Sequence, residues 1–301
     1  MRTPKDWLAL VAKGFAMGSA DLVPGVSGGT IAFISGIYEE LVSTFAGLGP
    51  KTVKDLFSLG IAETWKKYNI SFLVALVVGI FIAAVALSGL IHHLQASNPM
   101  ELRSFFFGLV IASTPLILKP VKANKVQTIV LVALGAAFAA WSTSLPPAVQ
   151  SDSPIFLAIS GAIAICAMIL PGISGSFLLI ILGAYSSVIA AIANFDIVRI
   201  AAFGGGIVVG ILLFSRLLKK LLNNHKDKTL SILAGVMLGA LGVLWPWKNN
   251  SEILFTHSDG RIEWITENFI PELGIESGMI ALWALIGSTV ITLIERIAKN
   301  Y

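Results

Sequence analysis

"LPGISGSF", residues 170–177, interrupts a segment that is otherwise as apolar as a membrane span. A near copy, "VPGVSGGT", occupies residues 23–30. Proline lacks a backbone N–H and disfavours helix in the residue before it, and glycine readily leaves the helical region. Each stretch therefore predicts a helix that ends and restarts inside an apolar segment.

The composition places the whole chain in a membrane. Of its 301 residues, 56% are hydrophobic and 13% charged, and the mean hydropathy is +0.85. Soluble domains carry about 25% charged residues, so an ordinary soluble protein is excluded. We expect an all-α polytopic membrane protein, because six further apolar runs approach the ~20 residues that cross a bilayer. The predicted transmembrane helices cover about residues 71–91, 104–118, 125–142, 198–215, 229–245 and 278–297.

The loop charges predict the orientation. Residues 48–70, 119–125 and 216–228 are rich in lysine and arginine, whereas residues 142–154 have neither and residues 248–276 are mostly acidic. By the positive-inside rule the first three loops and both termini lie in the cytoplasm, and the other two loops face outward. The net charge of +4 is thus a topology signal and not a nucleic-acid surface. Interfacial anchors are expected on the outer side at Trp141, Trp245 and Trp247.

Counting crossings between these loops predicts an inverted repeat. A broken hairpin at residues 7–45 enters and leaves on the cytoplasmic side, and a second at 155–193 enters and leaves outside. Three helices follow each hairpin, so the halves 1–147 and 148–301 have opposite orientations. Re-entrant hairpins fit best, because the first arm of the second hairpin is only about 24 Å long. Two short tilted spans remain the alternative.

The two breaks are the candidate binding site. Secondary transporters built from inverted repeats bind substrate near the membrane midplane, at broken helices. Restarted helices present unpaired N–H groups and a positive dipole end, and adjacent hydroxyls add donors, which together favour an anion. The alternative is that the motifs only kink and pack helices. The candidate substrate-binding residues are Pro24, Gly25, Ser27, Gly28, Gly29, Thr30, Pro171, Gly172, Ser174, Gly175 and Ser176, with Arg103, Arg199 and Arg216 at the ends of predicted spans.

Two carboxylates are candidates for binding a coupling cation or proton. Asp21 lies three residues before Pro24, within the first hairpin, and Glu39 follows Tyr38 at the far end of that hairpin. An ionisable group at membrane depth is a functional candidate, although Asp21 is equally well explained as a cap or an arginine partner. No metal, cofactor or enzymatic activity is expected. The single cysteine, Cys166, excludes a multi-cysteine metal site, and no histidine is placed to activate Ser174.

"SADLVPGVSGGTIAFISGIYEEL", residues 19–41, and "LPGISGSFLLIILGAY", residues 170–185, resemble a bacterial and archaeal family of polyprenyl-phosphate transporters, formerly catalogued as a domain of unknown function. The resemblance covers essentially the whole chain, including "WPW" at 245–247. It implies an inner-membrane flippase that returns undecaprenyl phosphate from the outer to the cytoplasmic leaflet for cell-envelope synthesis. The alternatives are an ion-coupled transporter or channel for a small soluble anion, and a membrane scaffold. Whether the chain forms a homo-oligomer is left open.

Overall fold

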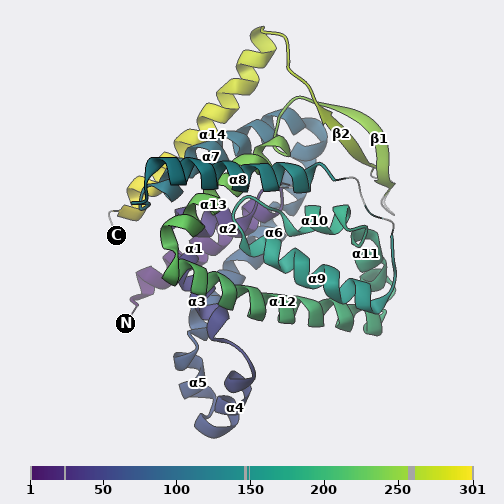
Figure 1. The fold of residues 1–301 in the computed structure, drawn as a ribbon. Helices are drawn as coiled ribbons and strands as arrows, with labels where there is room; N and C mark the ends of the chain where they lie inside the picture. The colour runs from purple at the N-terminus through teal and green to yellow at the C-terminus, as the bar shows by residue number, and fades with distance from the viewer. Residues whose placement is uncertain (1, 24, 146–147, 149, 257–261, 300–301) are drawn as a thin grey trace.

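The computed structural model describes residues 2–23, 25–145, 148, 150–256 and 262–299, and these are helical apart from one two-stranded hairpin (Figure 1). Within these described residues, five helices are long and apolar enough to cross a membrane. The expected all-α polytopic membrane protein is confirmed. The five helices are α6 (Ile70–Ser97), α7 (Pro99–Leu118), α8 (Lys125–Thr143), α12 (Ile197–Asn224) and α14 (Ile275–Lys299).

The one remaining predicted span, 229–245, forms a shorter helix than expected. It consists of α13 (Lys226–Gly239), about 21 Å long, and a single 3₁₀ turn, Ala240–Gly242. Two further helices lead into the broken segments, α1 (Pro4–Asp21) and α9 (Pro154–Ile169). Both begin at a proline, whose fixed φ and missing N–H suit the first helical position. Thr3 and Asp6 also form a capping box at the start of α1.

The long helices pair side by side through small residues. Gly14 and Gly18 of α1 lie against Leu76 and Ile80 of α6. In the same way, Gly206 and Gly210 of α12 lie against Ala158 and Ala162 of α9. A missing Cβ lets two helix backbones approach closely, which is the usual packing mode in membranes. Because residue numbers rise together in both members, each pair is parallel.

Two more parallel pairs join the halves of the chain. Gly235 and Gly239 of α13 lie against Val132 and Ala136 of α8. Between α7 and α14, Ser104 Oγ donates to Ile280 O at 2.5 Å and Ser288 Oγ to Gly108 O at 2.9 Å. Every parallel pair unites helices to which the loop charges assign the same direction. In each of these two pairs, the second helix after one hairpin packs against the third helix after the other, as an inverted repeat predicts. The division at residue 147 itself stays a prediction.

The two broken segments have matching backbones. Each continues after its motif with a seven-residue helix, α2 (Gly28–Ile34) or α10 (Gly175–Ile181), and then with α3 (Tyr38–Gly47) or α11 (Tyr185–Ala193). Seven residues reach about 10 Å, too little to cross a bilayer. α10 and α11 meet at 106°. Positive φ recurs at equivalent glycines, which are Gly25 and Gly172 before the short helices and Gly36 and Gly183 after them.

Three predicted loops contain regular structure. Residues 48–70 form α4 (Pro50–Leu59) and α5 (Ile61–Lys67), and residues 248–276 form the antiparallel strands β1 (Lys248–Thr256) and β2 (Ile262–Asn268). The prediction of a loop at residues 216–228 was wrong, because α12 continues to Asn224. Leucines at 217, 218, 221 and 222 maintain a helical apolar stripe there, and the basic residues occupy the other positions without ending the helix.

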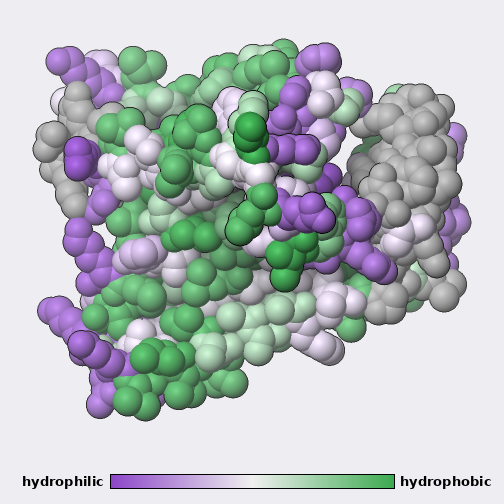
Figure 2. All heavy atoms as spheres, turned by 90° about the horizontal axis from the view of Figure 1, so that it is seen from above, coloured by the Kyte–Doolittle hydropathy of each residue, from purple (hydrophilic) through white to green (hydrophobic). Residues whose placement is uncertain are grey.

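The surface has the pattern of a membrane protein. In Figure 1, α1 begins and α14 ends on the left, whereas the strands lie on the right. Figure 2, which keeps that horizontal axis, shows apolar side chains through the middle and hydrophilic ones gathered along the left margin and in a second cluster to the right. Exposed side chains in the long helices include Phe81, Val85, Ile129, Val208 and Leu213. Such an apolar belt suits contact with lipid.

Candidate functional site

The structure brings the two predicted motifs together. We call residues 22–30 the first tip and residues 169–177 the second tip. Ser27 Oγ lies within hydrogen-bond distance of two carbonyl oxygens, Leu170 O at 3.1 Å and Met168 O at 3.3 Å. In the other direction, Gly172 N donates to Thr30 Oγ1 at 3.0 Å. Ser27 and Thr30 are 1% and 0% exposed, so these polar contacts lie inside the protein.

The first tip is occupied by a carboxylate of the chain itself. Gly28 N, at the start of α2, donates to Asp21 Oδ1 at 2.6 Å. Ser27 Oγ accepts from Gly29 N at 3.1 Å and so caps the same helix. Asp21 therefore lies where the sequence predicted an anion, in the capping arrangement that was the alternative explanation for this residue. Its predicted role in coupling is a separate matter that these contacts leave untested.

The second tip has a different set of contacts. Met168 stands at the position equivalent to Asp21, and Ser174 Oγ lies 3.0 Å from Ser176 Oγ of the same tip. Ser174 is buried, whereas Ser176 is exposed. Among the described residues, no carboxylate makes a hydrogen bond to the start of α10.

The tip glycines allow close backbone packing. A Cβ on Gly29 would lie 2.8 Å from Ile169 O, and one on Gly175 would lie 2.9 Å from Ala164 O. At Gly172, which has a φ of +89°, a Cβ would lie 2.7 Å from Met237 Cα. The packing explanation of the motif thus accounts for these glycines, and their predicted contact with substrate is untested. Pro171 is buried, and Pro24 lies outside the described residues.

The outlying candidates do not join the tips. Arg199 forms ion pairs with Asp152 at 3.8 Å and Asp196 at 3.4 Å, near the start of α12. Arg216 donates to Leu48 O and Ala46 O at the C-terminal end of α3. Glu39 is exposed and pairs with Lys226 at 2.6 Å.

Arg103 differs from Arg199 and resembles Arg216, because its described contact is a backbone carbonyl, Pro246 O, at 3.3 Å. Its side chain reaches the segment between α13 and β1. The i,i+3 spacing of Asp196 and Arg199 in the sequence indicated that these two side chains could form an ion pair. No comparable acidic neighbour in the sequence accounts for Arg103.

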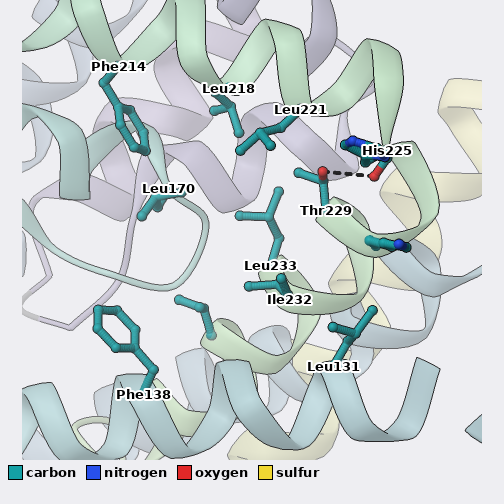
Figure 3. A pocket seen from close by; sticks show the side chains of 12 residues that line it. Leu131, Phe138, Leu170, Phe214, Leu218, Leu221, His225, Thr229, Ile232 and Leu233 are labelled. Carbon is teal, nitrogen blue, oxygen red and sulfur yellow. Dashed lines mark hydrogen bonds between the residues drawn. The ribbon is translucent and has the colours of Figure 1, made fainter. Parts of the chain in front are cut away.

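An apolar pocket of about 430 Å³ lies between α8, α12 and α13, and sequence reasoning missed it (Figure 3). Leu170 of the second tip, Phe138 and Phe214 line one end. The other end lies near the turn between α12 and α13, with His225 and Lys228. The pocket thus extends from the second tip toward a basic surface. No periodicity could have revealed it, because its walls are mostly ordinary apolar residues from distant parts of the sequence.

Comparisons with known proteins agree with the motif resemblance. A family model described as VCA0040-like, undecaprenyl phosphate translocase-like, matches residues 17–262. The polyprenyl-phosphate transporter of Vibrio cholerae serotype O1 is 41% identical over 266 residues, covering 88% of this chain and 86% of that relative. The polyprenyl-phosphate transporter of Staphylococcus aureus is 31% identical over 258 residues, covering 80% and 86%. No solved structure matches the chain. The resemblance is confirmed, and this chain belongs to the VCA0040-like family of undecaprenyl phosphate translocase-like proteins.

Proposed function

We propose that the protein is a polyprenyl-phosphate transporter and not an enzyme, and that it returns undecaprenyl phosphate from the outer to the cytoplasmic leaflet of a bacterial inner membrane. The names of its relatives support the substrate. The observation that carries the site is the direct hydrogen bonding between the two tips, through Ser27, Thr30 and Gly172. This contact concentrates buried polar groups in a structure that is otherwise suited to lipid.

The proposed site meets the main energetic difficulty of the reaction. An unpaired charge in hydrocarbon costs many kcal/mol, whereas the isoprenoid chain can stay in lipid throughout. The transporter therefore has to supply polar partners for the headgroup alone. At present Ser27 donates to Leu170 O, and Gly172 N donates to Thr30 Oγ1. Passage of a phosphate requires these bonds to open, and its oxygens then replace the carbonyl and hydroxyl partners.

Asp21 gives this exchange an electrostatic requirement. Its carboxylate already accepts from Gly28 N, the donor that a phosphate at the first tip would need. Two anions cannot share that donor without strong repulsion in a region of low dielectric. We infer that Asp21 takes up a proton or a cation, or swings away, whenever the headgroup is bound. This requirement supports Asp21 as the coupling residue and sets Glu39 aside, because Glu39 forms an ion pair at the surface.

The same proposal includes the topology. Cytoplasmic termini and inverted halves, 1–147 and 148–301, are supported by the loop charges and by the four parallel helix pairs. The matching φ angles of Gly25 and Gly172, and of Gly36 and Gly183, also support the repeat. In this arrangement the first hairpin enters the membrane from the cytoplasm and the second from outside, and both tips meet at one site between the repeats.

Reconstituted vesicles test the function directly. Labelled undecaprenyl phosphate placed in one leaflet should reach the other much faster with the wild-type protein than in empty vesicles. The matched lipid without its phosphate, undecaprenol, should gain nothing from the protein. Vesicles that take up soluble phosphate but leave the labelled lipid in place would instead establish the small-anion transporter.

A further inference from the structure

A pair of cations lies at the far end of the segment that follows α13. Arg103, in the first turns of α7, donates to Pro246 O at 3.3 Å. Lys248, two residues beyond Pro246, begins β1, and its Nζ lies 3.4 Å from Thr266 Oγ1 of β2. Both side chains are half-buried. In the part of the chain that the structure describes, neither has a carboxylate within ion-pair distance.

The two cations are partly buried and lie close enough to affect each other's charge. Five other cations of the described chain have acidic partners, and the ion pairs are Arg2–Glu40, Lys67–Asp55, Lys119–Glu295, Arg199 with Asp152 and Asp196, and Lys226–Glu39. Two neighbouring cations that are partly removed from water disfavour each other's charge. Burial and the nearby Arg103 lower the pKa of Lys248 to about 8. A bound anion would relieve both effects at once.

Aromatic rings adjoin the two cations. Trp245 lies 5.4 Å from Trp247 and 5.6 Å from Phe107, measured between ring centroids. Tryptophan favours the interface between lipid and water, because its ring is apolar and its N–H is polar. The cluster thus places apolar surface beside positive charge, the combination that suits an anionic lipid headgroup and the first part of its chain.

The segment 243–246 connects this cluster to the first tip. A Cβ on Gly25 would lie 2.7 Å from Val243 Cγ1 and 3.3 Å from Leu244 Cδ2. Trp245 follows directly, and Pro246 then contacts Arg103. A headgroup held by the cations would therefore be separated from the first tip by this one short segment.

From these contacts we propose that Arg103 and Lys248 form an anion site that binds a phosphomonoester on the outer side of the membrane, before the headgroup reaches the tips. The site deepens the proposed function and rests on its topology. Arg103 supplies a planar guanidinium and Lys248 a mobile ammonium, and together they match a doubly charged phosphate. The same chemistry would accept inorganic phosphate, so the two sources have to be separated by experiment.

The test uses the purified full-length protein in lipid nanodiscs and three probes, which are undecaprenyl phosphate, undecaprenol and inorganic phosphate. Arg103→Gln and Lys248→Gln should each weaken binding of undecaprenyl phosphate roughly tenfold or more, because each removes a charged hydrogen-bond donor. Binding of undecaprenol should not change. Lys248→Arg keeps the charge and should restore affinity. Lys54→Gln, which neutralises an exposed lysine in α4, is the matched control.

Four results would overturn the proposed site or its ligand. Wild-type affinity for undecaprenyl phosphate in both glutamine variants would overturn the site, as would an equal loss of undecaprenol binding or a lowered unfolding temperature that Lys248→Arg fails to rescue. Arg103- and Lys248-dependent binding of inorganic phosphate alone would assign a free-anion site and overturn the lipid headgroup as its ligand. The proposed function is tested separately, because wild-type transport of the labelled lipid does not depend on how these variants bind.

Discussion

The two tips share a backbone but differ in charge. Gly25 and Gly172 have φ values of +86° and +89°, and both tips lead into seven-residue helices. At the first tip the Asp21 carboxylate accepts from the restarted helix, whereas Met168 stands at the equivalent position before the second. The two tips therefore have the same backbone shape, whereas Asp21 and Met168 give them different electrostatic properties.

The difference has a mechanistic consequence. A transporter with two identical tips would bind an anion equally from either side, and nothing would link that binding to an ion gradient. In the proposed mechanism only the first tip has a titratable group, so binding of a phosphate shared by both tips depends on the protonation or cation occupancy of Asp21. A ligand shifts a conformational equilibrium only through its differential affinity for the two states. In the proposed mechanism, Asp21 supplies such a difference.

The largest expected effect concerns the sides from which the tips are reached. Cysteines at Lys5, in the first turn of α1, and at Ser153, directly before α9, replace exposed residues. In intact cells an impermeant thiol reagent should label the cysteine at 153 and not the one at 5, because the two hairpins enter from opposite sides. Permeabilised cells, in which both should react, provide the control. Equal external labelling of the two positions would contradict the inverted arrangement.

Alanine at the positive-φ glycines compares the packing of the two tips. Both substitutions impose left-handed strain of roughly 1–2 kcal/mol. Gly172→Ala should lower the unfolding temperature more, because its Cβ meets the Met237 backbone, whereas that of Gly25→Ala meets the Val243 side chain. Adding Val243→Ala should partly rescue Gly25→Ala. Gly89→Ala, whose Cβ has open space, serves as the control. If both variants lowered the unfolding temperature equally and Val243→Ala gave no rescue, the contacts of Gly25 and Gly172 would not distinguish the two tips.

Substitutions at Asp21 separate its charge from its capping role. Asparagine can still accept from Gly28 N, so Asp21→Asn should keep the wild-type unfolding temperature but lose gradient-driven transport by on the order of tenfold or more. Asp21→Ala should lose stability as well, by about 1–3 kcal/mol, because a buried donor is left unpaired. Transport assays with and without an imposed ion gradient provide the readout. Normal uphill transport by Asp21→Asn would leave Asp21 as a cap only.

A smaller effect is expected from pH at the outer cation pair. Lys248, with a pKa of about 8, carries its charge below that pH and loses it above. Affinity for undecaprenyl phosphate should therefore fall several-fold between pH 7 and 9, a range in which a phosphomonoester with a second pKa near 6 is already ionised. The groups known to face Lys248 are Arg103 of α7 and Thr266 of β2. Lys248→Arg should remove the pH dependence. The same fall in affinity between pH 7 and 9 in that variant would exclude Lys248 from the site.

Much of the fold could be predicted from the sequence, since long apolar runs and Pro-Gly breaks act locally. Five of the predicted spans correspond to α6, α7, α8, α12 and α14, and both breaks fall at the motifs. The β1–β2 hairpin was missed because residues 248–276 were judged by charge alone. α12 extended beyond its prediction because lysine and arginine are good helix formers.

Much less of the candidate site could be predicted. The meeting of the two motifs was expected, but the partners of their side chains depend on how helices pack in three dimensions. Ser27 bonds to carbonyls of the other tip, and Arg199 is held by two aspartates. Lys248 attracted no attention because it counted only as a loop charge. Its neighbour Arg103 lies far away in the sequence, and only the fold brings the two together.

The central claim is that both tips bind one phosphate, and a double-mutant cycle tests it most directly. Equilibrium binding of undecaprenyl phosphate would be measured for Ser27→Ala, Ser174→Ala and the double variant, each first checked for a wild-type unfolding temperature. Each alanine substitution removes one hydrogen bond to the charged phosphate, worth about 1.5–3 kcal/mol. Each single variant should therefore bind roughly ten- to a hundredfold more weakly. Because the tips share the ligand, the double variant should depart from additivity. Wild-type affinity in both single variants would contradict the claim.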